Sequence, residues 1–174
     1  DEKEEVRKRL TDILRELEDL SRENERSNRR ILDRVRELIE RVKKTNKDIL
    51  EEVERGGLPK DLLREIRERL RKHDKRVEEV LEEAERKVRD HDRENRRVTK
   101  EARELLEEAR RRVERIEDID KLRREVEELV RDLRRLIEEL SRSSEELVKE
   151  LEKLLRELEE SSKKLAEELR KAVE

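Results

Sequence analysis

Leucine, isoleucine, valine and alanine recur along the chain at spacings of three and four residues, and most of the intervening positions are charged. This spacing puts the apolar side chains on one side of an α-helix. At about 100° per residue, the apolar positions of residues 62–116 fall in one arc about 120° wide, and those of residues 119–173 fall in another of similar width. The pattern therefore predicts an all-α protein built from long amphipathic helices.

Two interruptions divide the pattern into three segments. The two glycines and the single proline lie together in residues 56–59, where glycine suits a helix end and proline the first turn of the next helix. The second interruption is a shift of phase by more than half a turn, which a single straight helix cannot make abruptly. We therefore expect a turn in residues 115–121, with Asp118 or Asp120 as the N-cap. The predicted helices span about residues 2–55, 59–116 and 119–173, each of roughly 55 residues.

One sequence repeat runs through all three segments, and its period is eighteen. This period corresponds to five helical turns, so the repeat keeps one face constant on a straight helix, whereas a strict heptad would impose a left-handed supercoil. Short connections make neighbouring helices antiparallel. We predict a single domain over residues 1–174: a straight, antiparallel, up-down-up three-helix bundle with little supercoil. The repeat is seen in Leu14, Leu32 and Leu50, in Leu70, Val88 and Leu106, and in Leu133, Leu151 and Leu169.

Polar residues inside the apolar arcs follow the same repeat: Asn28 recurs as Asn46, His73 as His91, and Ser144 as Ser162. Counting from the first connection places Asn24 opposite His91 and Thr45 near His73, and counting from the second places the serines opposite the two histidines. We therefore predict two buried polar layers. The His91 layer comprises Asn24, Asn28, His91, Asn95 and Ser144; the His73 layer comprises Asn46, His73 and Ser162, with Thr45 and Ser161 at its rim.

Hydrogen bonding gives these layers a structural interpretation. A buried imidazole or amide without a partner costs about 1–3 kcal/mol, whereas a satisfied hydrogen bond contributes only about 1 kcal/mol. Such layers add little stability, but they penalise wrong registers and wrong topologies.

The repeated His-Asp dipeptides, residues 73–74 and 91–92, raise the alternative of a metal or catalytic site. Two histidine ligands on one helix normally stand at i and i+4, but these two are about 27 Å apart along the helix axis. Asp74 and Asp92 rotate about 100° away from their histidines, to the outer edge of the apolar stripe. The chain also has no Gly-rich phosphate loop and no cysteine. We expect no enzymatic activity, no catalytic or metal-ligating residue, no cofactor and no small-molecule substrate.

Composition excludes further classes of partner. Charged residues make up 59% of the chain, but the net charge is only −3 and there are no aromatic residues. Nucleic-acid binding needs one-sided basic clustering or aromatic stacking, so we expect no nucleic-acid partner. There is no apolar run of about 18 residues and no signal-peptide pattern, so we expect a soluble chain with no membrane partner.

The whole chain resembles computationally designed (de novo) helical bundles with buried hydrogen-bond networks. The resemblance rests on the restricted alphabet, the connections GGLPKD and EDID, and the layers Asn28/His91/Ser144 and Asn46/His73/Ser162. It implies an engineered, thermostable structural scaffold of synthetic origin, with no natural biochemical function and no required partner, soluble and cytoplasmic on recombinant expression. A natural spectrin-like repeat is the rival, but such repeats usually carry core aromatics.

Two alternatives stay open. One is a binding module, the three-helix component of a designed homo- or hetero-oligomer such as a three-plus-one helix pair or a switch cage, which would self-associate or take a designed partner helix. The other is a pH-responsive element, because core histidines can drive switching. A single histidine in each layer gives the pH-responsive alternative only limited proton linkage in a monomer.

Overall fold

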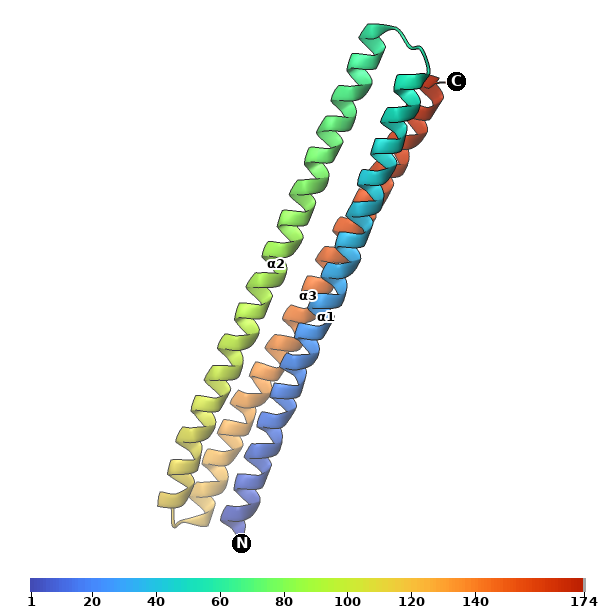
Figure 1. Ribbon diagram of the computed structural model, residues 1–174. Coiled ribbons are helices and arrows are strands. Elements are labelled where there is room, and N and C mark those ends of the chain that lie inside the picture. The colour runs from blue at the N-terminus through green and yellow to red at the C-terminus, as the bar shows by residue number, and fades with distance from the viewer. Residues whose placement is uncertain (174) are drawn as a thin grey trace. The chain divides into compact units, whose positions relative to one another are not determined.

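The structure, a computed structural model, describes residues 1–173, which form three long helices (Figure 1). Helix α1 spans Glu2–Arg55, α2 spans Lys60–Arg115 and α3 spans Ile119–Val173. There is no strand in these residues, and all three helices pack against one another. The prediction of an all-α three-helix bundle is confirmed, and each helix end lies within about one residue of its predicted position, the usual uncertainty of helix boundaries.

Aspartates cap the starts of α1 and α3. The Lys3 backbone N–H donates to Asp1 Oδ1 at 3.3 Å, and the Asp120 backbone N–H donates to Asp118 Oδ1 at 3.0 Å. These bonds satisfy N–H groups that have no partner within the helix. Of the two N-caps predicted for α3, the structure selects Asp118.

The connection between α1 and α2 depends on glycine. The backbone of Gly57 has φ of +64°, a left-handed conformation that side chains with a Cβ rarely adopt. The preceding Gly56 N–H donates to the Val53 carbonyl at 3.2 Å and closes the last turn of α1. The Pro59 carbonyl accepts from the Leu63 N–H at 3.0 Å, so the proline stands immediately before the first residue of α2.

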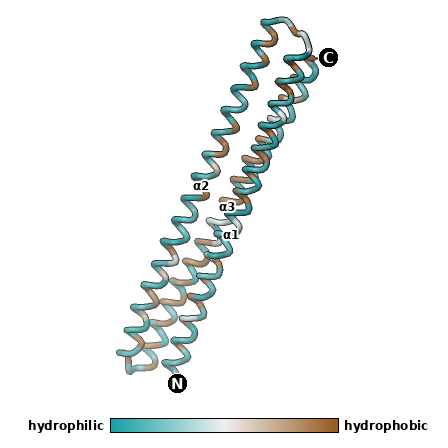
Figure 2. Tube along the Cα trace, in the orientation of Figure 1, coloured by the Kyte–Doolittle hydropathy of each residue, from teal (hydrophilic) through white to brown (hydrophobic). Residues whose placement is uncertain are grey.

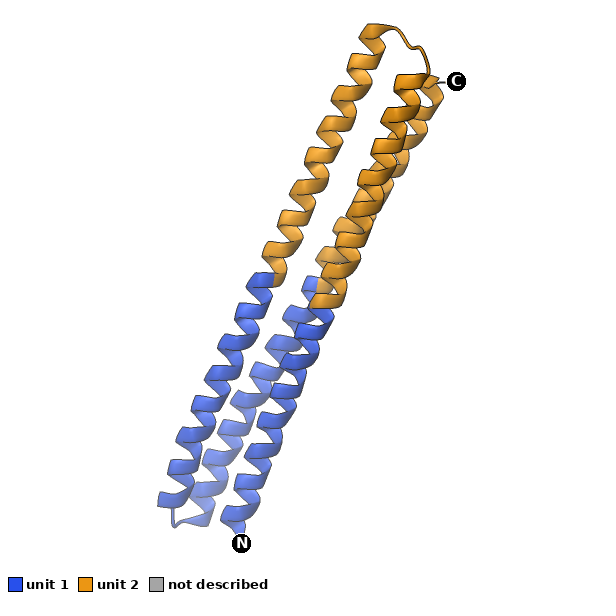
Figure 3. Cartoon of the chain, viewed as in Figure 1, with its two compact units in different colours: residues 1–28, 89–147 blue, residues 29–88, 148–174 orange. Residues whose placement is uncertain are grey.

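The chain forms two compact units, each built from one stretch of every helix (Figure 3). Unit 1 consists of Asp1–Asn28 and Arg89–Leu147. Unit 2 consists of Arg29–Val88 and the chain from Val148 onward. Both units therefore contain part of α1, part of α2 and part of α3.

In unit 1, contacts between helices show the antiparallel order. Arg103 pairs with Glu18 across α2 and α1, and Arg110 donates to Thr11 nearer the start of α1, so α2 runs against α1. Arg97 pairs with Glu139, across α2 and α3. The core beneath these contacts is aliphatic; its most completely buried members include Leu10, Leu17, Val98, Ala102, Leu133 and Leu140.

Unit 2 has the same up-down-up order. Lys43 of α1 pairs with Glu78 of α2, and Arg69 of α2 donates to Glu168 of α3 at 2.5 Å. Arg170 of α3 lies 3.8 Å from Glu52 of α1, so these two helices run in the same direction. Part of its aliphatic core is formed by Ile49, Val53, Ile66, Leu70, Leu165 and Leu169.

Hydrophobic residues recur along one side of each helix, and hydrophilic residues occupy the rest of its surface (Figure 2). The ion pairs on this surface are mostly exposed, and pairs of that kind contribute about 0–1 kcal/mol each. Aliphatic burial is therefore the main stabilising term. None of the described helices contains a stretch that is both long enough and apolar enough to cross a membrane.

Candidate functional site: two buried polar layers

In unit 1, the side chain of Asn28 joins α1 to one of the two His-Asp dipeptides of α2. Its Nδ2 donates to His91 Nδ1 at 2.8 Å and to Asp92 Oδ1 at 3.0 Å. Asn28 and His91 are both buried. One amide nitrogen therefore holds two neighbouring side chains of the facing helix.

These contacts determine the tautomer of His91. A carboxylate only accepts hydrogen bonds, so the amide nitrogen of Asn28, rather than its oxygen, must face Asp92. The same nitrogen faces His91 Nδ1, which must then accept. The neutral ring carries its proton on Nε2.

A second pair lies one helical turn away in the same unit. Asn24 Nδ2 donates to Asn95 Oδ1 at 3.3 Å, and both side chains are buried. Thr99, one turn further along α2, donates its hydroxyl to the Asn95 backbone carbonyl at 2.7 Å. The His91 layer thus extends along both helices.

Unit 2 contains the same arrangement, one sequence repeat away on each helix. Asn46 Nδ2 donates to His73 Nδ1 at 3.0 Å and to Asp74 Oδ1 at 2.8 Å. The same argument puts the proton of His73 on Nε2, which lies 3.3 Å from the hydroxyl oxygen of Ser162 on α3 and donates to it. The His73 layer therefore joins all three helices through hydrogen bonds.

The serines of α3 differ between the layers. Ser144, the repeat equivalent of Ser162, is half-buried, but the structure gives it no hydrogen bond to His91. Its neighbour Ser143 donates to Glu94 Oε2 at 2.8 Å and joins α3 to α2 at the edge of the layer instead. The prediction placed Ser144 in the hydrogen-bonded layer; the structure uses Ser143.

Within residues 1–173, neither of the two rim residues predicted for the His73 layer forms a hydrogen bond with its histidine. The Ser161 hydroxyl donates to the Leu158 backbone carbonyl at 3.1 Å, within its own helix. Thr45 is half-buried on α1, and the side chain that contacts the layer is that of its neighbour Asn46.

The His91 layer leaves several buried polar atoms unsatisfied. Among the residues described, Asn28 Oδ1, His91 Nε2 and Asn95 Nδ2 are buried without a hydrogen-bond partner. By contrast, His73 Nε2 has Ser162. The two layers therefore share the Asn–His–Asp contact but differ in how fully they are satisfied.

Burial sets the direction of both histidine pKa values. Removal from water disfavours the charged ring and lowers the pKa of His91, against the smaller opposing effects of the Glu94 and Asp92 carboxylates. Burial likewise lowers the pKa of His73, and the Asp74 carboxylate opposes it. The amide donors on Nδ1 act in the same direction, because an imidazolium would present a second donor to them.

The register between α1 and α2 corrects one prediction. Asn24 contacts Asn95 rather than His91, and Asn28 rather than Asn24 lies opposite His91. Similarly, Asn46 rather than Thr45 contacts His73. Counting residues from the connection misplaced α2 along α1 by about one helical turn. The reason is that the first residue of α2 is not level with the last residue of α1.

The register between α2 and α3 agrees closely with the predicted one. Counting placed His73 opposite about residue 163, and its contact is Ser162. It placed His91 opposite about residue 145, and the neighbouring Glu94 contacts Ser143.

Sequence reasoning missed the part played by Asp74 and Asp92, which it placed at the outer edge of the stripe. Each carboxylate accepts from the asparagine that also donates to the adjacent histidine. The recurrence of the whole His-Asp dipeptide, rather than of the histidine alone, in the next sequence repeat was the signal that could have identified them.

The hydrogen bonds of both layers run from one helix to another. The described side chains include no group of three or more His, Cys, Asp or Glu residues placed to hold a metal ion. The arrangement can position helices against one another through directional hydrogen bonds. No protein-family model, curated protein or solved structure matches the chain.

Proposed function

We propose that the chain is a de novo designed structural scaffold whose buried polar layers specify the register and topology of its helices, without a natural biochemical activity. The observation that supports this most strongly is the recurrence of one three-residue contact. Asn28, His91 and Asp92 in unit 1 have the same hydrogen bonds as their repeat equivalents in unit 2, Asn46, His73 and Asp74.

The energetic reason lies in the registers that the aliphatic residues alone would permit. Sliding a helix by seven residues rotates its apolar face by only about 20°, so leucines and valines would still meet aliphatic partners. The same slide would put His91 or Asn28 against aliphatic side chains, at about 1–3 kcal/mol for each unpaired group. The polar residues therefore discriminate between registers that hydrophobic burial does not distinguish.

The scaffold proposal is tested by replacing six layer residues with leucine: Asn24, Asn28, Asn46, His73, His91 and Asn95. We expect the unchanged chain to be a monomer by light scattering, with one set of amide resonances and a sharp unfolding transition at high temperature. The variant should unfold at an equal or higher temperature but give several masses or several sets of resonances. If the variant is a single monomeric species with unchanged inter-helix contacts, the layers do not specify the register.

A binding module is the second candidate, the three-helix component of a larger assembly. It is favoured by a groove of about 300 Å³ between α2 and α3 in unit 1, whose apolar lining includes Leu105 and Leu129. Light scattering over a hundredfold range of concentration separates the two candidates for self-association. A constant monomer mass excludes self-association, so a binding module would then have to take a separate partner helix. A mass that rises with concentration indicates self-assembly.

A further inference from the structure

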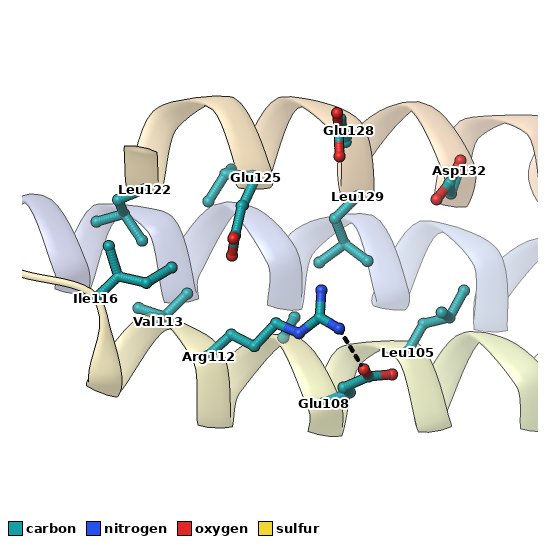
Figure 4. Close-up of a pocket in the computed structure, with 12 residues that line it drawn as sticks. Leu105, Glu108, Arg112, Val113, Ile116, Leu122, Glu125, Glu128, Leu129 and Asp132 are labelled. Carbon is teal, nitrogen blue, oxygen red and sulfur yellow. Dashed lines mark hydrogen bonds and ion pairs between the residues drawn. The ribbon is translucent and has the colours of Figure 1, made fainter. Parts of the chain in front are cut away.

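Unit 1 contains a groove between α2 and α3 (Figure 4). Its side chains differ from those at the repeat-equivalent positions of unit 2. In unit 2, cations of α2 pair with acids of α3: Lys87 donates to Glu150 at 2.7 Å, and Arg69 donates to Glu168 at 2.5 Å. Both pairs lie in unit 2, and they are one sequence repeat apart on each helix.

The repeat breaks at the groove. The next repeat equivalent of Lys87 on α2 is Leu105, and that of Glu150 on α3 is Asp132. A leucine thus stands where the other two repeats carry a cation. Within the described residues, Asp132 pairs only with Arg135 of its own helix, at 3.8 Å. Leu105 therefore adds an apolar side chain to the groove lining and leaves it without the positive charge that the other two repeats carry.

A second acid in the groove also lacks a partner from α2. Glu125 and Arg112 are the repeat equivalents of the hydrogen-bonded pair Ser143 and Glu94. Arg112 instead donates to Glu108, four residues earlier on its own helix, at 2.8 Å. Within residues 1–173, Glu125 Oε2 is buried and has no hydrogen-bond partner. Figure 4 shows the carboxylate of Glu125 directed into the groove from α3.

The charged residues that line the groove are therefore mostly acidic. Arg112 is the one cation among the residues that line the groove, and its guanidinium already donates a hydrogen bond to Glu108. A buried carboxylate oxygen without a donor is costly, and a charged donor supplied from outside would satisfy it. The acids that line the groove are Glu108, Glu125, Glu128 and Asp132.

We propose that this groove binds an amphipathic helix whose apolar face covers Leu105 and Leu129 and whose lysine or arginine donates to Glu125. The proposal gives a place and a partner to the binding-module function and rests on it. The groove lining extends from Leu105 to Val113 along α2, which is about 12 Å or just over two helical turns, and Ile116 adds to it just beyond the helix end. A groove of that length between two antiparallel helices can hold the side chains at positions i, i+3, i+4 and i+7 of a third helix.

The probe is an acetylated and amidated peptide of about five helical turns, with leucines on one face and lysines on both flanks, labelled with a fluorophore. Fluorescence anisotropy with the full chain measures its dissociation constant. A peptide with the same leucines and with glutamates in place of the lysines tests charge complementarity. We expect the lysine peptide to bind and the glutamate peptide to bind at least tenfold more weakly.

Two variants locate the binding site. Glu125→Gln keeps the shape of the side chain and removes its charge, so affinity for the lysine peptide should fall by about fivefold or more, as expected for one charge-assisted hydrogen bond. Leu105→Lys restores the cation of the repeat next to Asp132 and should reduce affinity by about tenfold or more. Its aliphatic stem still covers the apolar lining, so helical content and melting temperature should not fall.

Glu145→Gln is the matched control, because Glu145 is exposed on α3 within unit 1 and does not line the groove. This change alters the net charge by the same amount and should leave affinity within about twofold, as expected for one exposed charge. Equal loss in Glu125→Gln and Glu145→Gln would mean that the peptide responds only to overall charge and would overturn the proposal.

Other occupants give distinct results. If hexylammonium, followed by amide chemical shifts, binds the groove and the lysine peptide does not, the site takes a small cationic amphiphile and the helix proposal is wrong. If the chain self-associates and Glu125→Gln abolishes this, the occupant is a second copy. If self-association is unaffected by Glu125→Gln and the peptide does not bind, the binding-module function stands without this site. A monomer that binds neither probe contradicts both.

Discussion

His73 and His91 have matching neighbours on one ring nitrogen and different neighbours on the other. Each Nδ1 accepts from an asparagine that also donates to the following aspartate. The Nε2–H of His73 has a hydroxyl acceptor, whereas that of His91 is buried with none. The two residues therefore allow the energetic value of one partly buried hydrogen bond to be measured within one molecule.

Replacing each histidine with leucine should give unequal results. The His91→Leu change removes an unsatisfied N–H, and Asn28 keeps its hydrogen bond to Asp92. The free energy of unfolding should therefore fall by less than about 1 kcal/mol, or rise. His73→Leu also leaves the Ser162 hydroxyl without its partner, so it should cost about 1–2 kcal/mol. Urea unfolding measures both.

The prediction is that the free energy of unfolding falls more in His73→Leu than in His91→Leu. A loss above about 4 kcal/mol for His91→Leu would show that the ring forms an interaction absent from the described contacts. Equal losses in the two variants would show that Ser162 adds nothing.

The lowered pKa of both histidines predicts a dependence of stability on pH. In the unfolded chain the histidines take up protons as the pH falls through about 6.5. In the folded chain burial keeps them neutral to a lower pH. The unfolded state then binds more protons, so the free energy of unfolding should fall as the pH drops from about 6.5 to below the folded pKa values.

Two measurements check this prediction. Titration of the imidazole resonances should give both pKa values below the ordinary histidine value, and a raised value for either would contradict the burial argument. The double variant His73→Leu, His91→Leu should lose the slope just below pH 6.5. It should keep the acid sensitivity that arises at lower pH, where Arg9 and Arg123 lower the pKa values of their hydrogen-bonded partners Glu127 and Glu2.

Most members of the layers could be predicted from the sequence, but not all of their partners. Asn28, Asn46, His73 and His91 lie inside apolar arcs, and a side chain in that position must be buried when helices pack. The use of Ser143 at the arc's edge, rather than Ser144 inside the arc, could not be predicted, because it depends on the position of the Glu94 carboxylate. The role of Asp92 depends on the two donors of one amide nitrogen, which helical phase does not describe.

At the scale of the elements, register is set by side-chain pairing as well as by the connections. The α2–α3 turn is short and is capped by Asp118, so counting from it placed the facing residues well. The α1–α2 connection contains a left-handed glycine and permits an axial offset of about one turn, which counting missed. Contacts such as Asn28 with His91 show the actual register.

The α1–α2 connection should be sensitive to a single methyl group. Gly57 is exposed, and a Cβ there would meet no atom within 4 Å, so any cost must come from its φ of +64°. Gly57→Ala should lower the free energy of unfolding by about 1 kcal/mol, whereas Gly57→Asn should cost less, because asparagine tolerates the left-handed region better. Urea unfolding of both variants tests this, and equal costs would contradict the conformational explanation.

At the scale of the molecule, the boundaries between the units fall within continuous helices. They divide α1 after Asn28, α2 after Val88 and α3 after Leu147. No glycine or proline stands at these positions, and the helices run through them without interruption. Each unit has its own aliphatic residues and its own polar layer, but neither has helix ends of its own at the boundary.

This continuity predicts one cooperative unfolding transition. If unit 2 unfolded alone, three helices would have to end at new positions, each leaving backbone groups without intrahelical partners and without a cap. Every new end would also interrupt a helix whose propagation is favourable once it has nucleated. Calorimetry should therefore give a single peak with equal calorimetric and van't Hoff enthalpies, of roughly 120 kcal/mol near 60 °C for a chain of this length. Two resolved transitions, or a van't Hoff enthalpy near half the calorimetric value, would show that the units unfold independently and that the cost of the new helix ends is too small to couple them.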